Sequence, residues 1–120
     1  MLPTVVVAIV GVTVAINAFS GIAALLHWQP ILPGMVKAGV PESWLTFPIG
    51  TLKTAGAAGL LAGLLIQLPA LVVAAAIGLV LFFVCALYTH VRAADYTAQF
   101  FLAVFFLGMA CASLVLTLAA

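Results

Sequence analysis

Three long stretches of this chain contain no charged side chain: residues 1–36, 54–91 and 96–120. About 20 consecutive apolar residues are enough to cross a bilayer as a helix. Charged residues make up only 4% of the chain, whereas a soluble domain carries roughly a quarter. Three basic and two acidic side chains cannot cover a surface that faces water. The sequence therefore predicts an integral, multi-pass membrane protein, which we expect in a bacterial cell membrane.

The second uncharged stretch is too long for one crossing, because at about 1.5 Å per residue it would be roughly twice as long as the hydrocarbon core is thick. Gln67-Leu68-Pro69 interrupts it, and proline belongs in the first turn of a helix. The sequence therefore predicts an all-α fold, an antiparallel four-helix transmembrane bundle that forms a single domain. The expected helices cover about residues 4–27, 47–67, 69–91 and 95–118, and residues 28–46 form the one long loop.

No basic segment precedes the first apolar run, so we expect this run to be a retained span rather than a signal peptide. Four crossings place both termini on one side of the membrane. The long loop and the turn at residues 91–95 then lie on the opposite side, which we call side B. Because most charged and aromatic interfacial residues fall there, including all three basic ones, side B is predicted to be cytoplasmic. The residues concerned are Lys37, Glu42, Lys53, Arg92, Asp95, His27, His90, Trp28, Trp44, Tyr88 and Tyr96.

Two of the expected helices carry polar and small side chains at helical spacing. The first has Thr13, Asn17, Ser20, Ala24 and His27, and the last has Gln99, Ala103, Phe106, Ala110, Ser113 and Thr117. Such stripes usually pack against other helices, because lipid offers no hydrogen bonds. Packing is one interpretation, and a cavity lined by Asn17, Ser20, Gln99 and Lys53 is the other. In the second helix, Gly59 and Gly63 form a small-xxx-small pair that permits close helix approach.

The turn between the third and fourth helices carries two opposite charges. Arg92 lies at the carboxyl end of one helix and Asp95 at the amino end of the next, so each charge matches its helix dipole, and the two are placed to pair. Structure alone accounts for this turn. It does not explain why His27, Lys53, His90 and Gln99 fall at one level on four helices. That convergence indicates a pocket.

Several functions are disfavoured by the residues present. No aspartate or glutamate lies within an expected span, which argues against a proton-coupled drug exporter. Cys85 and Cys111 are separated by too much depth for a disulfide. His27 and His90 have no third partner, so we expect no metal site. A net charge of +1 gives no basis for nucleic-acid binding. No nucleophile, base and orienting group occur together, so catalytic residues stay unknown and enzymatic activity stays open.

Three segments resemble the DoxX-like family of small four-span membrane proteins. They are Lys37-Ala-Gly-Val-Pro41, the glycine- and alanine-rich run from Pro48 to Gly63, and His90-Val-Arg-Ala-Ala-Asp95. The resemblance covers nearly the whole chain. It implies a link to redox chemistry, since the namesake of the family is associated with a thiosulfate:quinone oxidoreductase. Distant relatives of similar architecture include membrane chaperones and sterol-handling proteins.

Our leading hypothesis is a bundle in the lipid bilayer that binds a lipophilic small molecule, a quinone or a lipid, near side B. It would serve as the membrane subunit of a redox system, with quinone as the candidate cofactor. Lys53 and Gln99 would contact the polar head, His27 and His90 would lie at the mouth, and Asn17 and Ser20 would line the interior.

The alternative hypothesis is a non-enzymatic assembly protein, chaperone or accessory subunit of a membrane complex. A membrane protein partner would then pack on the glycine-rich face of the second helix, and the polar turn would only cap helices. The sequence leaves open whether the chain also forms a homo-oligomer.

Overall fold

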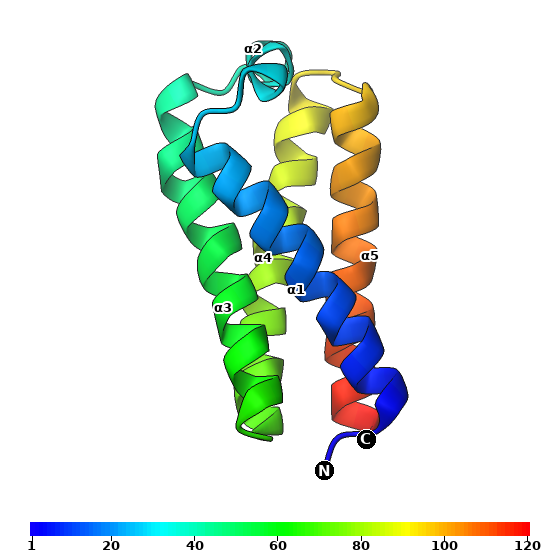
Figure 1. The fold of residues 1–120 in the computed structure, drawn as a ribbon. Coiled ribbons are helices and arrows are strands. Elements are labelled where there is room, and N and C mark those ends of the chain that lie inside the picture. The colour runs from blue at the N-terminus through cyan, green and yellow to red at the C-terminus, as the bar shows by residue number, and fades with distance from the viewer.

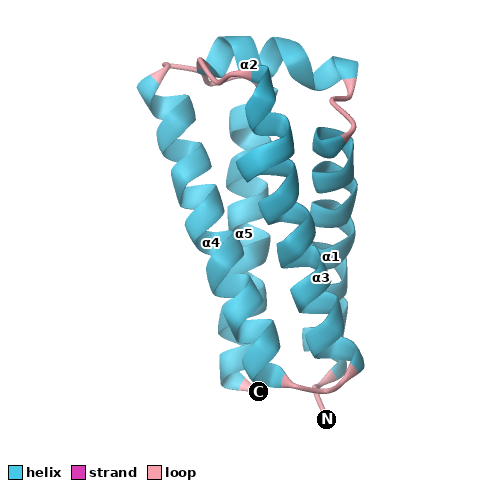
Figure 2. Cartoon of the chain, turned by 90° about the vertical axis from the view of Figure 1, so that its left-hand side faces the viewer, coloured by secondary structure: helices cyan, strands magenta, loops and turns pink.

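The computed structural model describes residues 1–120 and contains helices but no strand (Figure 2). Four long helices form the body of the molecule: α1 (Thr4–Leu25), α3 (Thr51–Leu65), α4 (Pro69–Arg92) and α5 (Ala98–Ala119). A short helix, α2 (Leu32–Ala38), lies across one end of the bundle (Figure 1). The predicted all-α fold is confirmed, with α2 as an addition inside the expected loop.

Four segments are long and apolar enough to cross a membrane: Thr4–Leu25, Glu42–Leu65, Pro69–Arg92 and Ala98–Ala119. Less than a third of each span is buried within the protein. Large apolar side chains such as Phe19, Leu81 and Phe101 are more than 60% exposed. Apolar surface costs about 25 cal/mol per Å² in water, so these outward faces fit hydrocarbon.

The four long helices form a ring in which each contacts two neighbours: α1 packs on α3 and α5, and α4 packs on the same two helices. Both termini lie at one end of the bundle, the terminal end, and α2 lies at the other, the α2 end (Figure 1). This is the placement that an antiparallel bundle requires. The antiparallel order itself and the single domain stay predictions of the sequence.

Three of the long helices end in the same backbone turn. The second residue after each helix has a left-handed conformation, with φ of 51° at His27, 53° at Gln67 and 53° at Ala94. The next residue along then donates its amide to a carbonyl five residues back: Trp28 to Ala23, Leu68 to Gly63 and Asp95 to His90. This is the Schellman motif, which usually places glycine at the left-handed position. Because none of the three is glycine, the stop signal is weak in the sequence.

The segment between α1 and α3 is more ordered than the predicted loop. It contains two 3-10 turns, Gln29–Ile31 and Glu42–Leu45, and the helix α2 between them. The second span was expected to be helical from residue 47, but α3 begins at Thr51. Phe47 is extended, with φ −143° and ψ 132°, because the residue before a proline avoids the helical region. The last helix likewise begins later than expected, at Ala98.

Close packing of α3 against α4 builds the terminal half of the bundle. A methyl group added at Gly63 would lie 2.5 Å from Cγ2 of Val72 and 2.9 Å from its backbone nitrogen. One added at Gly59 would lie 3.0 Å from Ala75, and one at Gly56 would lie 2.5 Å from Leu79. The predicted approach at Gly59 and Gly63 is therefore present, and Gly56 extends it. We call these three glycines and their α4 partners the glycine seam.

Most of the apolar core lies in the terminal half. Ten buried side chains form one cluster that reaches from the terminal end to Phe83: Leu2, Val6, Val10, Leu60, Leu64, Val72, Ala76, Leu79, Phe83 and Ala110. A second cluster, under α2, has only Ala24, Met35 and Leu45. The two ends of the bundle are therefore packed differently.

Candidate functional site

A cavity of about 490 Å³ lies in the α2 half of the bundle. It begins where the glycine seam ends: Lys53 lies one helical turn beyond Gly56 and Phe82 nearly one turn beyond Leu79, and both line it. The smaller residues of the seam hold α3 against α4, whereas these larger side chains occupy the space between separated helices. Residues of α1, α2, α3, α4 and α5 all contribute to the walls.

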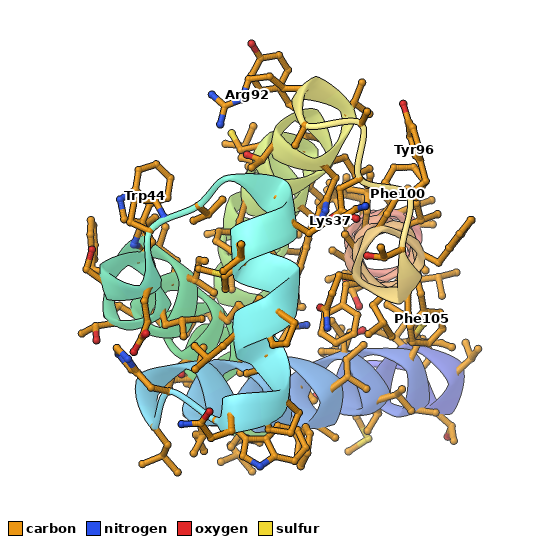
Figure 3. The ribbon with its side chains drawn as sticks, turned by 90° about the horizontal axis from the view of Figure 1, so that it is seen from above. Lys37, Trp44, Arg92, Tyr96, Phe100 and Phe105 are labelled. Carbon is orange, nitrogen blue, oxygen red and sulfur yellow. The ribbon has the colours of Figure 1, made fainter.

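Helix α2 covers the end of the cavity, and Figure 3 shows it lying across the other helices. Met35 and Ala38 of α2 are buried and line the cavity. Gly34 meets Gln99 of α5 closely, since a methyl group at Gly34 would lie 2.8 Å from Cγ of Gln99. The left-handed Gly39, with φ of 73°, then ends α2. This short helix separates the cavity from the aqueous side.

Lys53 points into the bundle and does not extend towards water. Its Nζ donates a hydrogen bond to Oγ of Ser20 at 2.8 Å. The same nitrogen lies 5.8 Å from the ring centroids of Phe82 and Phe83 and 5.7 Å from that of Phe106. Ammonium groups within about 6 Å of a ring face are attracted to it. Three helices, α1, α4 and α5, therefore supply the surroundings of one ammonium group from α3.

The close approach of α1 to α3 makes the bond between Lys53 and Ser20 feasible. Gly21 follows Ser20, and a methyl group there would lie 2.5 Å from Oγ1 of Thr54 and 3.1 Å from Cβ of Lys53. Only a glycine permits this contact. Packing of Ser20-Gly21 against Lys53-Thr54 thus places the hydroxyl group of Ser20 beside the ammonium group of Lys53.

Four of the six predicted ligand-binding residues line the same cavity: Lys53, Gln99, His90 and Ser20. They come from α3, α5, α4 and α1 respectively. Gln99 contributes an amide that can both donate and accept hydrogen bonds. His90 contributes an imidazole whose ring lies 6.3 Å from that of Phe100. The predicted convergence was of His27, Lys53, His90 and Gln99, and the last three of these line the cavity whereas His27 does not. The role of these residues in binding stays a prediction.

His27 lies outside the cavity lining. Its Nδ1 hydrogen-bonds Oε2 of Glu42 at 3.0 Å, and its Nε2 hydrogen-bonds Oγ1 of Thr46 at 2.9 Å. The left-handed turn at His27 itself takes the chain away from the axis of α1, so its ring reaches the loop before α3. The structure therefore assigns His27 to a link between α1 and that loop, and not to the expected mouth.

Asn17 also lies outside the cavity lining. It is fully buried, and its Nδ2 donates to the carbonyl of Thr13 at 2.9 Å. Oγ1 of Thr13 in turn hydrogen-bonds Oγ of Ser113 at 2.8 Å, which joins α1 to α5. This part of the predicted polar stripe therefore serves helix packing, as the alternative interpretation held, and only Ser20 of the stripe faces the cavity with Ala24.

The turn after α4 differs from the predicted pairing of Arg92 with Asp95. Asp95 is completely buried, and its Oδ2 lies 2.9 Å from Nδ1 of His90. The left-handed Ala94 reverses the chain and brings Asp95 back beside His90. Arg92 is exposed and points outward from the end of α4 (Figure 3). The expected ion pair is thus replaced by one between Asp95 and a residue that lines the cavity.

Asp95 also accepts a hydrogen bond from the backbone amide of Thr97 at 3.2 Å. Thr97 immediately precedes α5, so Asp95 caps the turn and not the helix itself. Burial alone would raise the pKa of Asp95, but hydrogen bonds from the Thr97 hydroxyl, from His90 and from the Thr97 amide outweigh it. The pKa of this carboxyl group is therefore held below its ordinary value, and Asp95 stays ionised.

Comparison with models of protein families identifies the family of this chain. The model of the DoxX-like family matches residues 8–113, from α1 to α5. The chain belongs to the DoxX-like family. With its four apolar spans it is an integral, multi-pass membrane protein. No curated protein and no solved structure gives a significant match to it.

The sequence did not reveal two components of the site in this DoxX-like protein. The first is the group of rings around Lys53, because Phe82 and Phe83 are ordinary residues for a membrane helix and only Phe106 fell on a predicted stripe. The second is the cover formed by α2. Pro33 in its first turn and Gly39 at its end are the signals that could have identified a short helix.

Proposed function

We propose that this DoxX-like protein binds a lipophilic small molecule, a quinone or a lipid, in the cavity under α2. We further propose that it does so in a bacterial cell membrane as the membrane subunit of a redox system. The observation that carries the proposal is the inward-pointing Lys53, whose ammonium group faces a cavity with mostly apolar walls. A charged side chain within a membrane span is costly unless it serves a purpose.

The composition of the walls supports a ligand with a large apolar body and a small polar head. Of the 25 lining residues, 17 are hydrophobic. Pockets for small molecules typically combine such walls with a few polar groups that orient the ligand. Lys53 and Gln99 line the cavity with hydrogen-bonding capacity to spare, and we propose that they contact the polar head of the ligand. Ser20 holds Lys53, and His90 lies nearer the aqueous end.

The lateral wall of the cavity supports entry from the bilayer. Leu52 on α3 and Leu81 on α4 line the cavity and are 42% and 62% exposed. Gly78 also lines it, and a methyl group there would meet no atom within 4 Å. The wall between α3 and α4 is therefore thin where it faces hydrocarbon. A molecule dissolved in the membrane could reach Lys53 by this route without entering water.

Native mass spectrometry of protein purified in mild detergent tests the proposal. Wild-type protein should retain a quinone or lipid, and the double variant Lys53→Leu, Gln99→Leu should lose it. Lys37→Leu on the exposed side of α2 is the matched control and should retain the ligand. Equal retention by the double variant and the control would contradict the proposal.

The structure gives less support to the alternative of an assembly protein, chaperone or accessory subunit. That hypothesis placed a partner on the glycine-rich face of the second span. Gly56, Gly59 and Gly63 contact α4 of the same chain, so this face is already covered. A protein partner would have to use another surface.

A further inference from the structure

Lys53 has no acidic partner within the chain. The protein contains only two acidic side chains, Glu42 and Asp95. Glu42 pairs with His27 at 3.0 Å, and Asp95 pairs with His90 at 2.9 Å. Both carboxylates are therefore engaged by histidines near the α2 end, and neither neutralises the charge of Lys53.

The surroundings of Lys53 stabilise a cation only in part. An ammonium group has three N–H donors, and Ser20 accepts one of them. The faces of Phe82, Phe83 and Phe106 attract positive charge, but they carry no net negative charge. A buried charge is stable when it is both paired and hydrogen-bonded. What the site lacks is an anion.

The position of Lys53 makes a ligand the natural source of that anion. Its ammonium group lies at the boundary between the glycine seam and the cavity, with Gln99 among the other lining residues. Gln99 lines the same cavity, and its amide can donate a hydrogen bond to an oxygen of a ligand there. Apolar walls extend from there to the thin region near Leu52, Gly78 and Leu81.

We propose, on the basis of the function proposed above, that the ligand is a single-chain amphiphile with an anionic head. The head, a carboxylate or a phosphate, pairs with Lys53, and the alkyl chain runs along the apolar walls towards the gap between α3 and α4. This assignment distinguishes an acidic lipid from a quinone, whose ring oxygens are neutral.

Competition binding in a non-ionic detergent tests this assignment with three probes of equal chain length: palmitate, hexadecyl phosphate and hexadecanol. Binding of each probe is measured by native mass spectrometry against the wild-type protein. Loss of a charge-assisted hydrogen bond reduces affinity on the order of 10- to 100-fold. We therefore expect at least one of the two anions to bind about tenfold or more tightly than the alcohol. The stronger anion identifies the head group.

Two variants locate the preference. Lys53→Met keeps an unbranched side chain, one atom shorter, and removes its charge, so the variant should bind the anion and the alcohol alike. Lys37→Met removes an exposed lysine and should keep the wild-type preference. Should Lys53→Met fail to fold, the wild-type series by itself still decides the matter.

The possible failures are distinguishable. Equal binding of all three probes to the wild-type protein would overturn the anionic assignment and leave the proposed lipophilic ligand intact. Binding of a quinone but of none of the three amphiphiles would have the same consequence. If neither the amphiphiles nor a quinone bound, the proposed function would fall with it.

Discussion

The two ends of this bundle are built from the same helices but packed in opposite ways. At the terminal end, most of the large apolar cluster and the glycine seam leave α3 in contact with α4. At the α2 end, a few buried apolar side chains and a short covering helix enclose a cavity, and the buried residues there include Ala24, Met35, Ala38 and Leu45. The difference follows from residue size along α3, where Gly56, Gly59 and Gly63 give way to Lys53 and Leu52. In this membrane bundle, one helix therefore provides close packing along one part of its length and the wall of a cavity along the other.

The polar residues of the two regions show the same contrast. Thr13 and Ser113 satisfy each other between α1 and α5, and no cavity-lining residue belongs to this pair. Lys53 has one hydroxyl partner and three rings, and it borders open space. The hydroxyl pair therefore joins two helices, whereas the ammonium group of Lys53 faces the cavity.

Shortening one leucine in the terminal half and one in the cavity wall should give the largest difference in the loss of stability. Leu60 is fully buried in the terminal half, and Leu81 lines the cavity at 62% exposure. Leu60→Ala leaves a hole in close-packed surroundings and should destabilise the fold by about 2–5 kcal/mol. Leu81→Ala should change stability by no more than about 0.5 kcal/mol. Thermal unfolding in detergent measures both, and equal losses would remove the contrast.

Adding a methyl group tests the same contrast in the other direction. Gly63→Ala places Cβ 2.9 Å from the backbone nitrogen of Val72, so α3 and α4 must separate, at a cost of about 1–3 kcal/mol. Gly78→Ala on the cavity side meets nothing within 4 Å. It should stabilise α4 by up to about 1 kcal/mol, because alanine is the better helix former. A tolerated Gly63→Ala would show that the seam is not close-packed in solution.

Acid should loosen the α2 end before the terminal end. The lowered pKa of Asp95 means that its ionised form favours the folded state. Its contribution is complete above the unfolded value of 3.8 and is lost as the pH falls through the lower folded value. Protection factors for hydrogen exchange, measured from pH 6 to pH 3, should therefore fall first in the turn at residues 93–97, and later in α3 near Leu60.

The variant Asp95→Asn provides the control for the acid effect. It should be less stable than wild type at pH 6, and the difference should shrink as the pH falls below the unfolded value of 3.8, because wild type then loses its carboxylate and the variant has none to lose. Glu42→Gln should have a smaller effect, because Glu42 is 59% exposed and exposed pairs contribute little. A constant difference between Asp95→Asn and wild type across this range would contradict the role given to Asp95.

The smallest expected effect concerns the backbone at the α2 end. Ala94 has φ of 53°, a conformation that glycine adopts more readily. Ala94→Gly should therefore stabilise the turn by about 0.5 kcal/mol, and Gly39→Ala, where φ is 73°, should destabilise α2 by about 1 kcal/mol. Melting temperatures that move in opposite directions would support both assignments, whereas a shift in the same direction would not.

Much of the fold could be predicted because its determinants are local. The absence of charge from three stretches locates the spans, and Gln67-Leu68-Pro69 separates α3 from α4. The close contact at Gly63 follows from the small residues themselves. The position of α2 could not be predicted, because it depends on the burial of Met35 and Ala38 against the long helices. That is a long-range contact with no periodic signal.

The sequence predicted the positions of site residues within the helices, because spacing along a helix gives their depth. It did not predict the positions of those at the turns. His27, Lys53, His90 and Gln99 were predicted to lie at one level on four helices, and the structure brings all but His27 to one cavity. His27 is itself in the left-handed conformation, and Asp95 follows the left-handed Ala94. No glycine marks either turn in the sequence. Their partners, Glu42 and His90, were therefore not foreseen.

The glycine seam divides the helix pair α3 and α4 into a part in close contact and a part where the two helices are separated. The two helices are in contact from their tight turn up to Gly56. Beyond Gly56, α3 separates from α4 but stays packed on α1, where a methyl group at Gly21 would lie 2.5 Å from Oγ1 of Thr54. Thr51, the first residue of α3, lies about 8 Å along the helix from Gly56, so a tilt of about 7° moves it by about 1 Å. The cavity can therefore change its width only if α1 tilts together with α3, while the contacts of the glycine seam stay unchanged.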